Sequence, residues 1–190
     1  MILPILIYGD PILRKKCISI FKNYPGLDKL IKNMFETMYK SKGIGLSAPQ
    51  IGKNINLFII DTSFLKENKK FQIKKFKKVF INPKILESSD KNYFDYEGCL
   101  SIPTIIEYLK RKPSILIEYF DENWKKHVKI FKGIIGRIFQ HEYDHLQGRL
   151  FIDFFSSIKK KLIKNKLKKI YKGKIKVYYK IKIYSQSNNY

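Results

Sequence analysis

Two of the chain's three histidines, His141 and His145, lie four residues apart, and Glu142 directly follows the first. Residues at i and i+4 share one face of a helix, so both imidazoles can bind one metal ion. Glu142 is turned by about 100° from His141 and can reach a water molecule at that ion. This HExxH spacing is typical of metal-dependent hydrolases. The alternative, two packed polar side chains on an amphipathic helix, explains the pattern less well.

A catalytic metal site usually takes three protein ligands, so one is still to be found. The side chains that could supply it are Cys17, Glu97, Cys99, His127 and Asp153. Some HExxH proteases use a histidine six residues after the second one, but that position is Phe151 here. His127 is expected to face solvent from a strand, and Cys17 is expected to be a buried core thiol. Cys99 and Asp153 therefore remain.

Cys99 has the more suitable surroundings of these two. It lies in the segment YEGCLSIP, where Gly98 allows a close backbone approach and Pro103 stiffens the exit. A thiolate with two imidazoles leaves the fourth metal position open, as catalysis requires. On the residues alone, an HExxH peptidase that uses Asp153 stays the alternative.

A glycine-rich segment, GIGLSAPQIG, covers residues 43–52. Its first six residues fit the dinucleotide-binding pattern GxGxxA, which should follow a strand and open a helix. Here the segment follows an expected helix, and Pro49 stands where a new helix would run. We therefore interpret it as a tight turn that presents its backbone and the Gln50 side chain to a ligand.

Three segments together resemble one family. GIGLSAPQ, EGCLS and QHEYDHLQG are similar, in order and separation, to the three motifs of peptide deformylases, and YGDPILRK and NMFETMY also resemble that family. The resemblance covers roughly residues 1–160 and implies removal of the N-formyl group from the initiator methionine of newly made polypeptides. Two features depart from the family: Ser47 replaces a usual alanine, and TIIEYLKRK after Pro103 matches poorly.

The resemblance assigns a role to each reactive residue. It implies that Cys99 joins His141 and His145 around one divalent metal ion, usually Fe²⁺, with Zn²⁺, Ni²⁺ or Co²⁺ as substitutes. Glu142 is then the general base and afterwards the general acid. The Gln50 side-chain amide and the Leu100 backbone N–H are expected to stabilise the negative charge on the formyl oxygen.

A formyl-methionyl substrate needs an apolar slot beside the metal. Ile134 and Ile138 precede His141 on its helical face and are predicted to form one wall. Ile44 and Leu100 are candidates for a second wall. Ordinary core packing would explain the two helical isoleucines equally well.

Backbone contacts to the substrate are expected from small residues. Gly43, Gly45 and Gly98 would let a peptide backbone lie against the enzyme in a strand-like pairing. Glu97, the neighbour of Gly98, is expected in the same substrate site.

Hydrophobic periodicity predicts which elements carry these residues. Helices are expected over 27–42, around His141 with a stop at Gly148, and over 155–171, while strands are expected over 55–61, 77–86, 114–120, 127–131 and 174–184. A solvated lysine-rich loop should join 55–61 to 77–86. The predicted fold is α+β, with antiparallel sheets packed around the helix that carries HExxH and with a lysine-rich C-terminal helix. We expect a catalytic domain over 1–172 and a tail over 173–190, a short strand with a frayed end.

The net charge of +23 has two interpretations. Only four of the 39 basic residues are arginine, whereas proteins that read nucleic acid favour arginine. Most of the charge therefore indicates compositional drift towards lysine. The lysines of the last helix could still contact the ribosome transiently. A basic RNA- or ribosome-binding protein without catalysis is the other alternative, but it leaves HEYDH, Cys99 and Gln50 unexplained.

The remaining composition predicts a folded protein of the cytoplasm. A hydrophobic fraction of 44% is that of a globular chain. The opening MILPILIYGD lacks the basic start of a signal peptide, and no apolar run reaches the ~18 residues that span a bilayer. Two cysteines form no disulfide framework. We expect neither membrane nor DNA as a partner.

Overall fold

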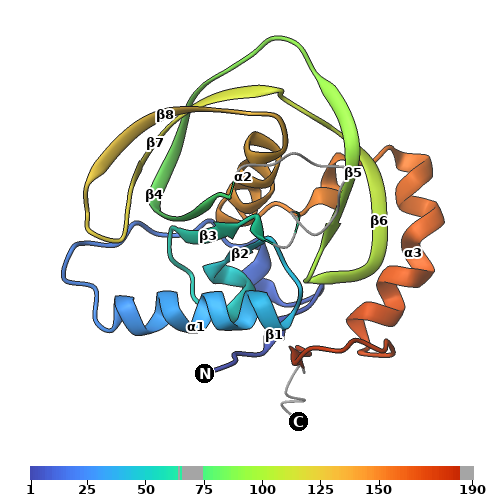
Figure 1. The fold of residues 1–190 in the computed structure, drawn as a ribbon. Coiled ribbons are helices and arrows are strands. Elements are labelled where there is room, and N and C mark those ends of the chain that lie inside the picture. Colours follow the sequence, from blue (N-terminus) through green and yellow to red (C-terminus); the bar gives the residue numbers. More distant parts are fainter. Residues whose placement is uncertain (64, 66–74, 185–190) are drawn as a thin grey trace.

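The computed structural model describes residues 1–63, 65 and 75–184, and it has an α+β fold (Figure 1). Its helices are α1 (Leu27–Lys40), α2 (Gly133–Leu146) and α3 (Ser157–Tyr171), with short 3₁₀ helices η1 (Pro11–Arg14), η2 (Ala48–Ile51) and η4 (Phe151–Phe154). Its strands are β1 (Ile5–Leu6), β2 (Gly45–Ser47), β3 (Leu57–Asp61), β4 (Lys77–Ser88), β5 (Tyr93–Cys99), β6 (Ile102–Arg111), β7 (Ser114–Phe120), β8 (Lys126–Lys132) and β9 (Ile181–Lys182). These elements confirm the predicted class.

The largest sheet has five antiparallel strands in the order β2-β3-β4-β7-β8. Strand β3 is buried along its whole length, so its continuous run LFIID fits a strand covered on both faces. Strands β7 and β8, which confirm the strands predicted over 114–120 and 127–131, form an antiparallel hairpin. The predicted strands at 55–61 and 77–86 are confirmed with small shifts at their ends. The loop expected between them lies mostly outside the described residues.

Strands β5 and β6 form a separate antiparallel hairpin that the sequence analysis did not predict. Its register pairs Tyr93 with Arg111 and Gly98 with Ile106, and it shifts between Gly98 and Cys99. A register shift of this kind re-aims the next side chain, so Cys99 leaves the regular ladder at the end of β5. The segment that matched the family poorly, after Pro103, is therefore strand β6.

Helix α2 packs against β2, β3, β7 and β8. Phe139 is fully buried there, with its ring centroid 5.0 Å from that of Phe58 and 5.2 Å from that of Phe80. Edge-on aromatic contacts of this kind fix the helix over the sheet. The histidines of α2 are thereby held by a core that packs on the other side of the helix.

The C-terminal part differs from the prediction. Helix α3 begins at Ser157, and the Ser156 hydroxyl caps it by accepting a hydrogen bond from the Lys159 N–H. The predicted strand over 174–184 is mostly wrong, because only Ile181–Lys182 is a strand, paired in parallel with β1. A strand needs a partner with free backbone groups, and β1 offers only two residues.

None of the described helices has the length and apolarity needed to cross a bilayer.

Candidate metal centre

Cys99 of β5 and the two histidines of α2 converge in the structure. One ligand atom from each of Cys99, His141 and His145 lies within 4.8 Å of the others. The Cys99 Sγ is 3.2 Å from the His145 Nε2, and the two imidazole rings are 5.2 Å apart between centroids. One sulfur and two imidazole nitrogens at this separation fit a small divalent cation such as Zn²⁺ or Fe²⁺.

Asp153, the other candidate that the residues left open, is occupied elsewhere. Its carboxylate accepts a hydrogen bond from the Arg14 guanidinium at 2.6 Å and another from the Leu150 N–H at 2.8 Å. It therefore caps η4 and joins it to η1. The group of metal-binding side chains found among the described residues does not include Asp153.

Two further candidates, Cys17 and His127, also lie away from the site. Cys17 is a buried core thiol, as expected, and burial raises the pKa of Cys17 to about 12. His127 does not simply face solvent, so that expectation was wrong. Its Nε2 lies 2.6 Å from the Asp121 carboxylate, and its ring stacks on Tyr119. The acid comes from the turn between β7 and β8.

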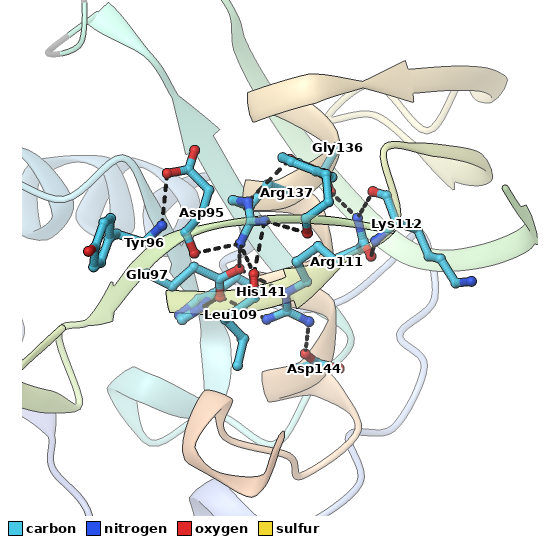
Figure 2. Close-up of polar contacts among 12 residues, drawn as sticks. Asp95, Tyr96, Glu97, Leu109, Arg111, Lys112, Gly136, Arg137, His141 and Asp144 are labelled. Atoms are coloured by element: carbon cyan, nitrogen blue, oxygen red, sulfur yellow. Dashed lines mark hydrogen bonds and ion pairs between the residues drawn. The ribbon is translucent and has the colours of Figure 1, made fainter. Parts of the chain in front are cut away.

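Glu97 connects the metal centre to a buried network of charges (Figure 2). Its carboxylate lies 3.0 Å from the His141 Nδ1, and it accepts two hydrogen bonds of 2.9 Å from Arg111 and one of 2.6 Å from Arg137. Burial raises the pKa of Glu97, but its hydrogen bonds with His141 and Arg111 outweigh this effect and hold the pKa well below its usual value. An ionised Glu97 bonded to Nδ1 leaves Nε2 of His141 for the metal.

The two arginines that hold Glu97 were not recognised from the sequence. Arg137 is 2% exposed and also donates to the backbone carbonyls of Tyr93 and Leu109. Arg111 pairs in addition with Asp144 of α2. These contacts tie the β5–β6 hairpin to the helix, so the relative position of the cysteine and the histidines depends on them.

Glu142 is buried, and its environment is shaped by the glycine-rich segment. The Ser47 hydroxyl donates a hydrogen bond to its carboxylate. A Cβ atom at Gly45 would lie 2.8 Å from the carboxylate carbon, so this position has room only for glycine. Burial raises the pKa of Glu142, while the charge of His141 and the hydrogen bond from Ser47 offset part of that rise.

Gln50 is held in a fixed orientation by three neighbours. Its Oε1 accepts a hydrogen bond from the Ser47 N–H at 2.8 Å. Its Nε2 donates to the Ser101 Oγ at 3.2 Å and lies 3.6 Å from the Cys99 Sγ. The expected turn is thus strand β2 followed by η2, and it does direct the Gln50 amide at the metal centre.

A cavity of about 570 Å³ opens beside these residues. It is lined by Cys99, His141 and Glu142, and by all the predicted substrate residues, which are Gly43, Ile44, Gly45, Gln50, Glu97, Gly98, Leu100, Ile134 and Ile138. Four residues of the C-terminal tail, Lys176, Val177, Tyr178 and Tyr179, also line it, and these were not predicted. The volume is that of a typical small-ligand pocket.

Comparison with known proteins agrees with this geometry. The polypeptide deformylase family model matches residues 2–161. A peptide deformylase of Karelsulcia muelleri is 59% identical over 154 residues, which is 80% of this chain and 78% of that protein. One from Christiangramia forsetii is 50% identical and covers 88% of each chain.

Solved structures are similar over the same region. A plant peptide deformylase, PDF1B, superposes with a TM-score of 0.81 and 37% identity and covers 90% of each chain. A Plasmodium falciparum peptide deformylase gives a TM-score of 0.80 and 40% identity, covering 89% of this chain and 95% of that one. The fold and site therefore define a metal-dependent hydrolase. The chain belongs to the polypeptide deformylase family, whose members remove the N-formyl group from nascent polypeptides.

Proposed function

We propose that this chain hydrolyses the formamide of formyl-methionyl peptides and releases formate and a free amino terminus. The observation that carries this proposal is the convergence of Cys99, His141 and His145 within 4.8 Å, at a cavity that also contains the buried Glu142. Neither a non-catalytic RNA-binding protein nor a peptidase with Asp153 as ligand accounts for this arrangement.

The ligand set supports one divalent metal ion. We assign Fe²⁺ as the native ion, because it is the usual metal that the family resemblance implies. Zn²⁺, Ni²⁺ or Co²⁺ are possible replacements, since a thiolate with two imidazoles suits all four ions. When bound, such an ion supplies a Lewis acid that activates water and polarises a carbonyl oxygen. Cys99, His141 and His145 would hold it, and the Glu97 contact fixes the ring of His141.

The reaction needs one proton to move twice. We assign Glu142 as the base that takes the proton from the attacking water and then gives it to the leaving amine. A raised pKa suits this role, since a carboxylate that binds a proton more strongly is a better base towards the attacking water. The Gln50 amide and the Leu100 N–H are assigned as donors to the formyl oxygen as its negative charge grows.

Substrate selection is assigned to the apolar walls of the cavity. Ile44, Leu100, Ile134 and Ile138 would contact the methionine side chain. Gly43 and Gly98 would leave room for the peptide backbone. Glu97 was expected to contact substrate, but its carboxylate oxygens already bond to three side chains, so we now assign it to orienting His141.

The finer organisation of the chain follows from the same site. We assign a catalytic domain to residues 1–172, with α2 as the central helix that carries HExxH, and a tail to residues 173–190. Formyl-methionyl nascent peptides are made in the cytoplasm, where we place the protein. We assign a transient ribosome contact to the lysines of α3, of which Lys159 is half-buried and the others are exposed, namely Lys160, Lys161, Lys164, Lys166, Lys168 and Lys169. Ribosome pelleting at rising salt tests this, since phosphate contacts weaken steeply with salt.

The deciding experiment is hydrolysis of formyl-Met-Ala by protein purified without oxygen. We expect release of formate with about one metal ion per chain. The Glu142→Gln variant should keep its metal and lose about 10²- to 10⁴-fold in kcat. Protein that carries one metal ion per chain and releases no formate would contradict the proposal.

A further inference from the structure

The segment after α3 forms a strap, defined here as residues 174–182, which bends at Tyr178 and Tyr179. Alternate side chains along it are half-buried, at Ile175, Val177, Tyr179 and Ile181, whereas the lysines between them are exposed. Its end is anchored to the first strand, because the Ile5 N–H donates to the Lys180 carbonyl at 2.9 Å. Figure 1 shows this course from the end of α3 towards β1.

The strap borders the substrate cavity on its way to β1. Lys176, Val177, Tyr178 and Tyr179 all line that cavity. Two tyrosine hydroxyls attach the strap to backbone carbonyls of two separate segments of the chain. The Tyr178 hydroxyl donates to the Ser41 carbonyl at 3.0 Å, just before the glycine-rich segment, and the Tyr179 hydroxyl donates to the Leu100 carbonyl at 2.8 Å.

The contact between Tyr179 and Leu100 reaches the reaction centre. Leu100 directly follows Cys99, and its N–H is the assigned donor to the formyl oxygen. A hydrogen bond to the Leu100 carbonyl restricts rotation of this residue's backbone. Burial raises the pKa of Tyr179, so the hydroxyl keeps its proton and remains a donor.

We propose that the strap is a wall of the substrate cleft and that Tyr179 is a positioning residue, which holds Leu100 in the orientation needed for catalysis. The inference rests on the proposed function and adds to it a part of the chain beyond residues 2–161, the range matched by the family model. The aromatic ring of Tyr179 forms the wall, and its hydroxyl does the positioning.

Two substitutions separate these roles. Tyr179→Phe keeps the ring and removes the hydrogen bond, so kcat for formyl-Met-Ala should fall about 3- to 10-fold with KM within about twofold of wild type. Tyr179→Ala removes the ring as well and should also raise KM by about threefold or more. Tyr184→Phe is the matched control, since it removes a tyrosine hydroxyl just beyond the strap, away from the cavity.

Metal content and melting temperature are measured for every variant, and rates are expressed per metal-loaded chain. A Tyr179→Phe enzyme with wild-type kcat would overturn the positioning role. A Tyr179→Ala enzyme with an unchanged or lower KM would overturn the proposal that the ring of Tyr179 is a wall of the cleft. A higher rate would also overturn it, because the strap would then block the cleft. If Tyr179→Ala fails to fold, Tyr179→Phe still decides the positioning role. A metal-loaded wild-type protein without activity would instead count against the proposed function.

Discussion

The hydroxyl of Ser47 donates a hydrogen bond to the carboxylate of Glu142, and it also lies 3.1 Å from the Glu142 backbone carbonyl. Ser47 is the position where the sequence departs from the alanine usual in the family. A change from alanine to serine is small, yet the side chain touches the assigned general base. Ser47 is fully buried, so no solvent competes for this hydrogen bond.

Replacing Ser47 by alanine should change the pH dependence of the reaction. The hydrogen bond from Ser47 lowers the pKa of Glu142, so its loss should raise that pKa further. Since the base works as a carboxylate, the acid limb of kcat/KM should move to higher pH, with wild-type and variant rates converging at high pH. Rates of formyl-Met-Ala hydrolysis across pH, at equal metal content, measure this. A limb that stays in place or moves to lower pH contradicts the prediction.

Gly45 should be intolerant of a side chain for a reason different from the one the sequence suggested. The sequence pattern indicated backbone pairing of this glycine with the peptide, but a Cβ there would meet the Glu142 carboxylate. Gly45→Ala should therefore displace the base and lower kcat by about 10²-fold or more, within the range that a general base contributes.

Gly43→Ala is the useful comparison for Gly45→Ala. Its Cβ would lie 2.9 Å from a terminal methyl group of Leu100, which is the far end of a flexible side chain and can move. We expect a smaller loss than for Gly45→Ala, seen mainly in KM. Equal losses of kcat in both variants would argue against a special relation between Gly45 and Glu142.

The Glu97 network predicts a joint loss of stability and metal affinity. Glu97→Gln leaves Arg137 buried without its full counter-charge, which should cost about 3–5 kcal/mol in the free energy of unfolding. The weaker contact to His141 should lower metal affinity about 10- to 100-fold. Urea denaturation and competition with a chelator measure the two effects. Asp95→Asn changes a half-buried carboxylate on the same strand that accepts a hydrogen bond from the Tyr96 N–H, and it should leave both nearly unchanged.

The same network has a defined pH dependence. The pKa of Glu97 is lower in the folded protein than in the unfolded chain. Its contribution to stability is therefore complete above the unfolded carboxyl pKa of about 4.3 and is lost as pH falls below that value towards the folded pKa. The wild-type free energy of unfolding should fall more steeply with acidification than that of Glu97→Gln. Parallel curves for the two proteins would contradict this assignment.

The cluster of Cys99, His141 and His145 could be predicted because its signals are local. His141 and His145 follow helical periodicity, and Cys99 lies in a short motif. The partners of Glu97 could not be predicted, since Arg111 reaches Glu97 through the β5–β6 register, which the sequence does not reveal. One signal was present but unused. In a chain with 35 lysines, the few arginines mark places where a planar, multiply bonding cation is required.

The tail shows that a local sequence pattern can predict the burial of a segment without predicting its hydrogen-bonded partner. Its alternation of lysine with apolar residues predicts a strand, and the alternation of burial is indeed present. The hydrogen-bonded partner is not encoded in that local pattern, and β1 supplies only Ile5 and Leu6. What the pattern encodes is an extended segment with one buried face, and the packing of the whole chain decides whether it lies against a sheet or a cavity.

The two cysteines should differ sharply in reactivity, and the bound metal should control one of them. Cys17 is buried with a pKa of about 12, so only ~1 in 10⁴ of its thiols is ionised at pH 8. Cys99 lines the cavity and is expected to be masked by the metal. Iodoacetamide followed by mass spectrometry should therefore label neither cysteine in the metal-loaded protein and Cys99 alone after chelation.

Denatured protein, in which both cysteines should be labelled, is the control for this experiment. Circular dichroism of the chelated protein shows whether the fold persists, so that a label on Cys17 can be attributed to unfolding or to native exposure. Labelling of Cys99 at the same rate with and without metal would mean that its sulfur is not a ligand. In that case the two histidines would bind the ion without it, and the assigned site would lose the thiolate on which its chemistry depends.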